Sequence, residues 1–150
     1  MWLDAILAYL HFTAIFLLFS FLTVQVILIR QPMDLRNVRL IGRVDIWYFA
    51  SAIGALVTGF LRAAFGAKGG DFYFGAWPIY VKIALFFLIA ALSIKPTMTF
   101  IRWRRTLEAE PGWQVPAGEH AAIRKVVFIE VHLAALIPVF AVIMSRGLGH

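Results

Sequence analysis

The sequence predicts an all-α protein of one domain, an integral membrane bundle of four membrane-spanning helices. Of its 150 residues, 62% are hydrophobic and 15% are charged, whereas a soluble domain has about 45–50% apolar and about 25% charged residues. Four apolar runs are each long enough to cross the hydrocarbon core of a bilayer as a helix. These runs and their connections use up the chain, so the lipid bilayer is the first partner that we expect.

The four spans are expected at about residues 2–29, 45–64, 77–94 and 121–144. The first is too long for the apolar region of a signal peptide, and no Lys or Arg precedes it, so we expect it to be retained. The third meets a break at Lys95-Pro96, although its helical pattern extends to residue 100. Pro138 predicts a kink in the fourth.

A short amphipathic helix is expected in the first loop, between residues 34 and 43. Its arginines, Arg36, Arg39 and Arg43, are spaced three and four residues apart and therefore share one helical face. A basic face of this kind binds the anionic surface of a bilayer. We expect this helix to lie on the membrane surface, ahead of the second span.

The basic residues also predict the orientation of the chain. Because loops rich in Lys and Arg stay in the cytoplasm, both termini should lie outside, in a bacterial inner membrane. The net charge of +6 reflects this topology, and we expect no nucleic-acid partner. The chain has no cysteine, which excludes thiolate chemistry and Cys-ligated metals. Ten of the fourteen Lys and Arg belong to the first and third loops and their edges: Arg30, Arg36, Arg39, Arg43, Lys95, Arg102, Arg104, Arg105, Arg124 and Lys125.

Three polar residues are expected in the outer half of the membrane, namely His11, Arg62 and Lys82. From a rise of about 1.5 Å per residue, Arg62 and Lys82 lie roughly 6 Å below the outer boundary and His11 roughly 10 Å. Intramembrane charges are costly and usually functional. Such a cluster would suit a carboxylate, a phosphate or a porphyrin propionate. The plainer interpretation is that both cations reach up to the lipid headgroups.

The fourth span carries two ionisable residues, Glu130 and His132. Residues two apart point about 200° away from each other on a helix, so only one of them can face the bundle centre. The sequence leaves open which one does. Lys125, seven residues before His132, shares the face of that histidine. A carboxylate at the depth of Glu130 should be paired or protonated.

The second span has small residues at every fourth position, Ala50, Gly54 and Thr58. Small residues with this spacing allow two membrane helices to approach closely. The stripe therefore predicts a packing face, and a homodimer through this face is one interpretation of it.

An ordered series of motifs runs along the chain: Thr58-Gly59-Phe60-Leu61-Arg62, Lys68-Gly69, Tyr73, Trp77, Lys82, Ser93-Ile94-Lys95-Pro96-Thr97 and Trp103. Over nearly the whole chain, this series resembles a family of small bacterial inner-membrane proteins of unknown function. More distantly, Leu10-His11 and Trp77 followed by Lys82 are similar to HemJ-type protoporphyrinogen oxidases and CopD-like copper-resistance membrane proteins. In the HemJ type, a first-span His and a later-span Lys are the functional pair, and haem binding is associated with the family. By motif, that pair corresponds to His11 and Lys82.

The first functional hypothesis is a membrane oxidoreductase that binds haem b or another porphyrin. His11 would ligate the iron, Arg62 and Lys82 would pair with the propionates, and Lys82 and Glu130 are the catalytic candidates. His132 is the other intramembrane histidine, but it lies about 10 Å deeper than His11. The sequence thus favours a single His ligand or none. A copper site is less favoured, because no His pair has a spacing of three or four residues.

Two other classes of function stay open from the sequence. One is a small dimeric transporter or transporter subunit for an anion or for protons, using the intramembrane titratable residues of both membrane halves. The other is a structural or assembly protein, in which the polar residues only hold the helices together.

Overall fold

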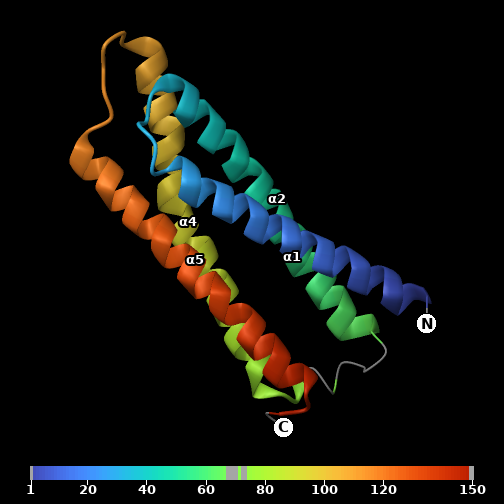
Figure 1. The fold of residues 1–150 in the computed structure, drawn as a ribbon. Helices are drawn as coiled ribbons and strands as arrows, with labels where there is room; N and C mark the ends of the chain where they lie inside the picture. The colour runs from blue at the N-terminus through green and yellow to red at the C-terminus, as the bar shows by residue number, and fades with distance from the viewer. Residues whose placement is uncertain (1, 67–70, 72–73, 149–150) are drawn as a thin grey trace.

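Four long helices make up the fold of the computed structural model, which describes residues 2–66, 71 and 74–148. In chain order they are α1 (Trp2–Leu28), α2 (Leu35–Phe65), α4 (Trp77–Ala109) and α5 (Ala117–Ser145) (Figure 1). Each is long and apolar enough to cross a membrane. The all-α bundle with four membrane spans is therefore confirmed. Lys68, Gly69 and Tyr73 of the motif series lie outside the described residues.

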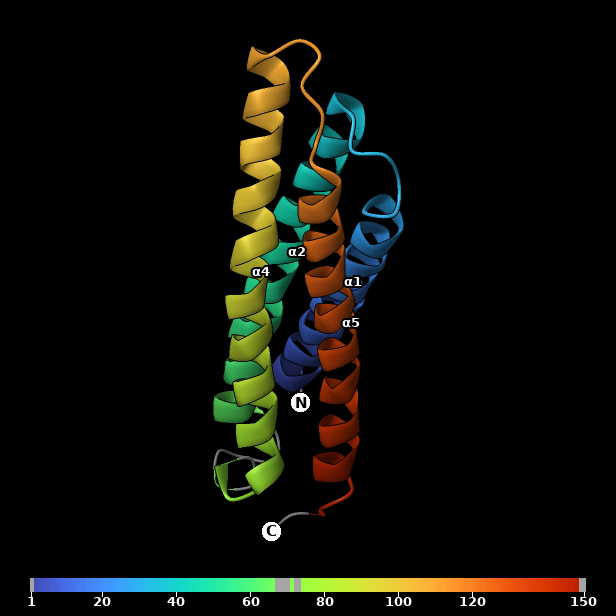
Figure 2. The ribbon, with the colours of Figure 1, turned by 90° about the vertical axis from the view of Figure 1, so that its left-hand side faces the viewer.

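The helices form two antiparallel hairpins. α1 packs mainly on α2, and α4 packs mainly on α5, so that α4 and α5 stand side by side with the first hairpin behind them (Figure 2). α2 and α4 form the main contact between the hairpins. α1 and α5 meet near the first linker and diverge toward the chain termini (Figure 1). Both termini lie at one end of the bundle, opposite the linkers 29–34 and 110–116, as the expected topology requires.

The basic segment of the first loop is not a separate helix, which corrects the expectation from the sequence. Residues 35–43 are the first turns of α2, which continues without a break to Phe65. The side chain of Asp34 caps this helix, because its Oδ1 accepts a hydrogen bond from the backbone N–H of Asn37 at 2.8 Å. Val38 and Ile41 of the segment are buried in the core. Their burial holds the segment in the bundle and directs its arginines outward.

α4 and α5 also extend beyond the expected spans. α4 passes through Pro96 and ends at Ala109, and α5 begins at Ala117. The hydroxyl group of Thr99 donates to the carbonyl oxygen of Lys95 at 2.8 Å, on the turn next to the proline. The proline therefore does not end the helix, and α4 is a continuous scaffold for residues on both sides of it.

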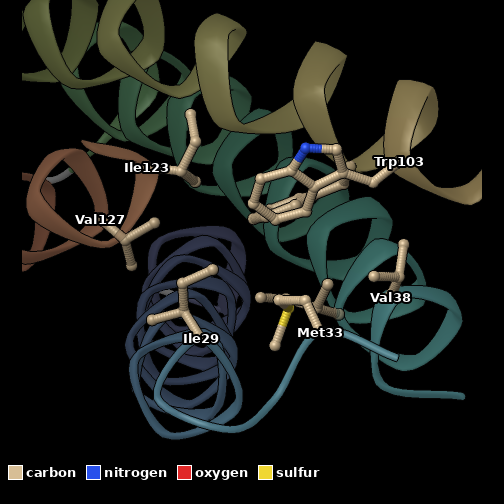
Figure 3. Close-up of a cluster of buried hydrophobic side chains, with 8 residues drawn as sticks. Ile29, Met33, Val38, Trp103, Ile123 and Val127 are labelled. Atoms are coloured by element: carbon tan, nitrogen blue, oxygen red, sulfur yellow. The ribbon is translucent and has the colours of Figure 1, made fainter. Parts of the chain in front are cut away.

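An apolar cluster joins the two hairpins at the end that carries the linkers (Figure 3). The indole ring of Trp103 on α4 has no exposed surface and lies across from Ile29 at the end of α1 and Met33 in the linker. We call this group the inner cluster; its members are Ile29, Met33, Val38, Ile41, Phe100, Trp103, Ile123 and Val127. His120 adds a polar link, because its Nε2 lies 2.7 Å from the carbonyl oxygen of Ile29.

The outward faces of the helices are covered by large apolar side chains. Phe16 is 74% exposed, Ile46 67% and Trp47 61%. In water such surfaces would be unfavourable, whereas lipid tails are as apolar as these side chains. The bilayer is therefore the natural solvent for this surface.

The small-residue stripe of α2 packs against α1 of the same chain. A Cβ atom placed on Gly54 would lie 3.5 Å from the Cβ of Ala14, and one on Gly59 would lie 3.0 Å from Cε1 of His11. Thr58 contacts the same histidine. The expectation of close packing holds, but Gly54 and Thr58 contact α1 and do not present a dimer face. Ala50 is the exposed member of the stripe.

Candidate functional site

The structure decides which ionisable residue of α5 faces the interior. Glu130 is 1% exposed and points into the bundle. His132 is exposed, and its Nδ1 lies 2.6 Å from the carbonyl oxygen of Phe128 on its own helix. Lys125 is exposed as well and lines the same shallow surface hollow as His132. The shared face of Lys125 and His132 is confirmed, and it is directed away from the bundle.

Asp45 lies at the centre of a buried polar layer that the sequence did not reveal. The residue is 4% exposed and belongs to α2. Its Oδ1 accepts a hydrogen bond from Nε2 of Gln25 on α1 at 2.8 Å, and its Oδ2 accepts one from the hydroxyl group of Thr97 on α4 at 2.7 Å. One carboxyl group thus joins three helices.

A second layer lies one helical turn further toward the termini. The hydroxyl groups of Tyr48 on α2 and Ser93 on α4 are 3.3 Å apart, and Ser93 donates to the carbonyl oxygen of Ile89 on its own helix at 2.9 Å. The carboxyl group of Glu130 on α5 lies close to Ser93. Oε1 of Glu130 is buried and has no hydrogen-bond partner among the described residues. Together the two layers draw on all four helices.

The two layers are enclosed by apolar side chains on either side. The inner cluster closes the side of the linkers, and Leu22, Ile89 and Ala134 pack around Tyr48 on the other side. Every ion pair among the described residues is at least partly exposed near the linkers and involves neither Asp45 nor Glu130. Two carboxyl groups therefore share an interior in which the described residues give them hydroxyl and amide partners and no cation.

The predicted outer cluster is assembled from three helices. Nδ1 of His11 on α1 lies 3.0 Å from the hydroxyl oxygen of Thr58 on α2. The guanidinium carbon of Arg62 lies 5.1 Å from the centre of the Phe12 ring, an arrangement of the cation–π type. Lys82 on α4 is half-buried, and both cations are within electrostatic range of His11. The structure thus brings His11, Arg62 and Lys82 together.

The hydrogen bonds of Thr58 favour one tautomer of His11. The Thr58 hydroxyl group donates to the carbonyl oxygen of Gly54 at 2.6 Å, so it uses its proton there and accepts from His11. The N–H group of the neutral imidazole is then on Nδ1, and the lone pair is on Nε2. Metal-bound histidines commonly have this arrangement, with one ring nitrogen donating to the protein and the other on the metal.

The two histidines of the membrane spans lie apart. His11 lies at the α1–α2 interface, whereas His132 is on the outward face of α5. If a haem is bound, His11 and not His132 is therefore the residue of this pair that would hold it. Arg62 and Lys82 are of the type that pairs with propionate carboxylates.

The sequence contains partial signals for Gln25, Asp45 and Thr97, which it did not predict as site residues. Asp45 precedes Tyr48 by three residues and therefore shares a helical face with it, but Asp45 stands at the edge of the second apolar run, where a boundary residue is expected. Thr97 stands after the Lys95-Pro96 break. Gln25 is a polar residue within the first apolar run, and the sequence names no partner for it. The pairing of these residues depends on the register between helices, which periodicity does not give.

These features define an integral multi-pass membrane protein with four spans and a polar interior. The family model for predicted membrane protein (DUF2214) matches residues 3–149. The chain belongs to this family, which confirms the family of small membrane proteins of unknown function expected from the motif series. No curated protein and no solved structure matches the sequence. The more distant likeness to the HemJ-type and CopD-like proteins stays a prediction.

Proposed function

We propose that the outer cluster binds haem b through His11 and that the protein acts in membrane redox chemistry. The observation that carries this proposal is the contact of 3.0 Å between Nδ1 of His11 and the Thr58 hydroxyl group, which itself donates to Gly54 and so favours the tautomer with the lone pair on Nε2. A histidine whose second nitrogen is fixed in this way is oriented for one metal ligand position. Haem bound there would supply one-electron chemistry.

The two cations of the outer cluster support an acidic porphyrin as the ligand. Arg62 and Lys82 are half-buried, and among the described residues neither cation forms an ion pair. The Nε atom of Arg62 is buried and has no hydrogen-bond partner in the part of the chain that the structure describes. A buried N–H group without an acceptor costs about 1–3 kcal/mol, and a propionate carboxylate would remove that cost at Arg62. Lys82 could pair with the second propionate.

The close approach of α2 to the histidine also supports the proposal. Gly59 lies next to the imidazole, and a Cβ atom at this position would lie 3.0 Å from Cε1 of His11. Any larger residue would push the ring away from α2. The glycine therefore lets the ring lie close to the helix while its Nδ1 reaches Thr58.

We infer that the protein lies in a bacterial inner membrane with both termini outside, because the basic linkers belong on the cytoplasmic side. The outer cluster would then be near the outer surface. Lys82, which is half-buried and within electrostatic range of His11, is the candidate for a catalytic role beside the porphyrin. Glu130, the other catalytic candidate, lies in the separate buried layers.

The test is an absorption spectrum of the detergent-purified protein, before and after dithionite, from cells supplied with a haem precursor. We expect a Soret band that sharpens on reduction and is lost in His11→Ala. His132→Ala is the matched control, because that histidine is exposed on α5, and it should keep the full band. A flat spectrum of the wild type, or loss of the band in the control and not in His11→Ala, would refute the proposal.

A further inference from the structure

We propose that Glu130 and Asp45 form a proton-binding site that passes protons through the interior of the bundle. The proposal is independent of haem, since it rests on the two buried layers and not on the outer cluster. It starts from an unusual pair: two carboxyl groups, 1% and 4% exposed, inside a membrane-spanning bundle.

Two carboxyl groups buried inside a membrane-spanning bundle lower the stability of the fold, and such residues are usually functional. An Asp at the centre of a membrane helix costs about 2.5–3.5 kcal/mol on insertion scales. Asp45 recovers part of this cost through two hydrogen bonds, from Gln25 and Thr97. Glu130 recovers less, because its Oε1 has no partner among the described residues. An unpartnered carboxyl oxygen at this depth is the atom at which we expect an exchangeable proton.

A proton is the ligand that fits these carboxyl and hydroxyl groups. The described residues include no group of three or more His, Asp or Glu side chains that could hold a metal ion. A carboxyl group, by contrast, binds a proton alone and passes it through neighbouring hydroxyl groups. The ionisable groups around Glu130 are Asp45 and Tyr48, both on α2. Neither is a cation that would fix the carboxylate in its charged form.

The hydroxyl groups form a short relay between the layers. The hydroxyl group of Ser93 lies 3.3 Å from that of Tyr48 and donates to the carbonyl oxygen of Ile89 on its own helix at 2.9 Å. Tyr48 follows Asp45 by three residues on α2, a rise of about 4.5 Å, and Thr97 follows Ser93 by four on the antiparallel α4. The relay would run from Glu130 through Ser93 and Tyr48 toward Asp45, and it requires the Ser93 hydroxyl group to turn from Ile89 toward Glu130. In each transfer a hydroxyl group accepts one proton and donates another, so no charge is left on Ser93 or Tyr48.

Apolar side chains limit where protons can enter. The inner cluster covers the layers from the linker side, and the cluster around Leu22 and Ile89 covers them from the other side. Proton exchange with water therefore requires the hairpins to part. α1 and α5 contact each other little and already diverge toward the termini (Figure 1), so we place the entry between these two helices.

The experiment measures proton flux into vesicles that contain the purified protein free of haem and a pH-sensitive dye, driven by a potassium diffusion potential. We expect Glu130→Gln, which keeps the size and the polar character of the side chain, to lower the flux at least tenfold. Asp45→Asn should lower it as well. Glu110→Gln, an exposed position in the linker after α4, is the control and should conduct like the wild type.

A second readout does not depend on flux. Infrared difference spectra in H₂O and D₂O report the C=O stretch of a protonated carboxyl group, and we expect a band that shifts on deuteration and is missing in Glu130→Gln. A wild type no faster than empty vesicles, or Glu130→Gln with the flux and band of the wild type, would overturn the proposal. The haem proposal is tested by the spectrum of His11→Ala and can fail on its own.

Discussion

Removal of the Asp45 carboxyl group should loosen three helices at once. In Asp45→Ala, the amide of Gln25 and the hydroxyl group of Thr97 both lose their acceptor. Interhelical hydrogen bonds in a membrane protein average about 0.6 kcal/mol and reach about 1.7 kcal/mol. Two such bonds give an expected loss of about 1–3 kcal/mol in the free energy of unfolding. Thr97→Val removes one of them and should cost about half as much.

A double-mutant cycle makes this prediction specific. Once Asp45→Ala has removed the acceptor, Thr97→Val has no bond left to break, so the double variant should be little less stable than Asp45→Ala alone. The assay is unfolding in mixed micelles of increasing SDS content, followed by tryptophan fluorescence. Thr23→Val is the control, because the Thr23 hydroxyl group bonds only within α1 and is exposed. Strictly additive effects of Asp45→Ala and Thr97→Val would refute the three-helix junction.

Two further predictions concern packing. Gly54→Leu should lower the free energy of unfolding by about 1–3 kcal/mol, because the leucine meets Ala14. Ala50→Leu, on the exposed part of the same stripe, is the control and should leave stability unchanged. A loss of dimers in Ala50→Leu without loss of stability would instead favour the dimer face. Trp103→Ala should lower the free energy of unfolding by about 3–5 kcal/mol in the same SDS assay, because the indole is fully buried. Trp47→Ala, on the lipid-facing side, is the control and should leave stability nearly unchanged. Equal effects of the two substitutions would show that the inner cluster does not hold the hairpins together.

The fold was predictable from the sequence because it depends on composition and length. Four apolar runs of sufficient length leave few alternatives in a bilayer, since every backbone polar group must be satisfied within the helix. The start of α2 was not predictable in the same way. The segment around Arg36 and Arg43 has the pattern of a surface helix, and only the burial of Val38 and Ile41 against other helices shows that it is part of α2.

The candidate sites were predictable in part, for a similar reason. Helical periodicity predicts that Glu130 and His132 point in opposite directions. Which of them faces the interior depends on how α5 is rotated against its neighbours. The outer cluster was found because its three members are unusual residues in apolar runs. The junction of Gln25, Asp45 and Thr97 was missed because it needs the relative height of three helices, a property of the packed bundle.

The unbroken course of α2 has a mechanical consequence. From Leu35 to Phe65 it is a rod of about 46 Å, longer than the hydrocarbon core of about 30 Å. At one end Arg39 is tied to Glu108 of α4 by two hydrogen bonds, of 3.1 Å and 3.0 Å. The same rod then carries Asp45 and, at its far end, Arg62.

No proline interrupts α2, whereas α4 contains Pro96 and α5 contains Pro138. A tilt or rotation of α2 is therefore shared by everything attached to it, from the linker side to the outer cluster. A displacement that begins at the linker end of the bundle would reach the proposed haem site in the same movement. α2 is thus the element through which the two faces of the membrane can influence each other.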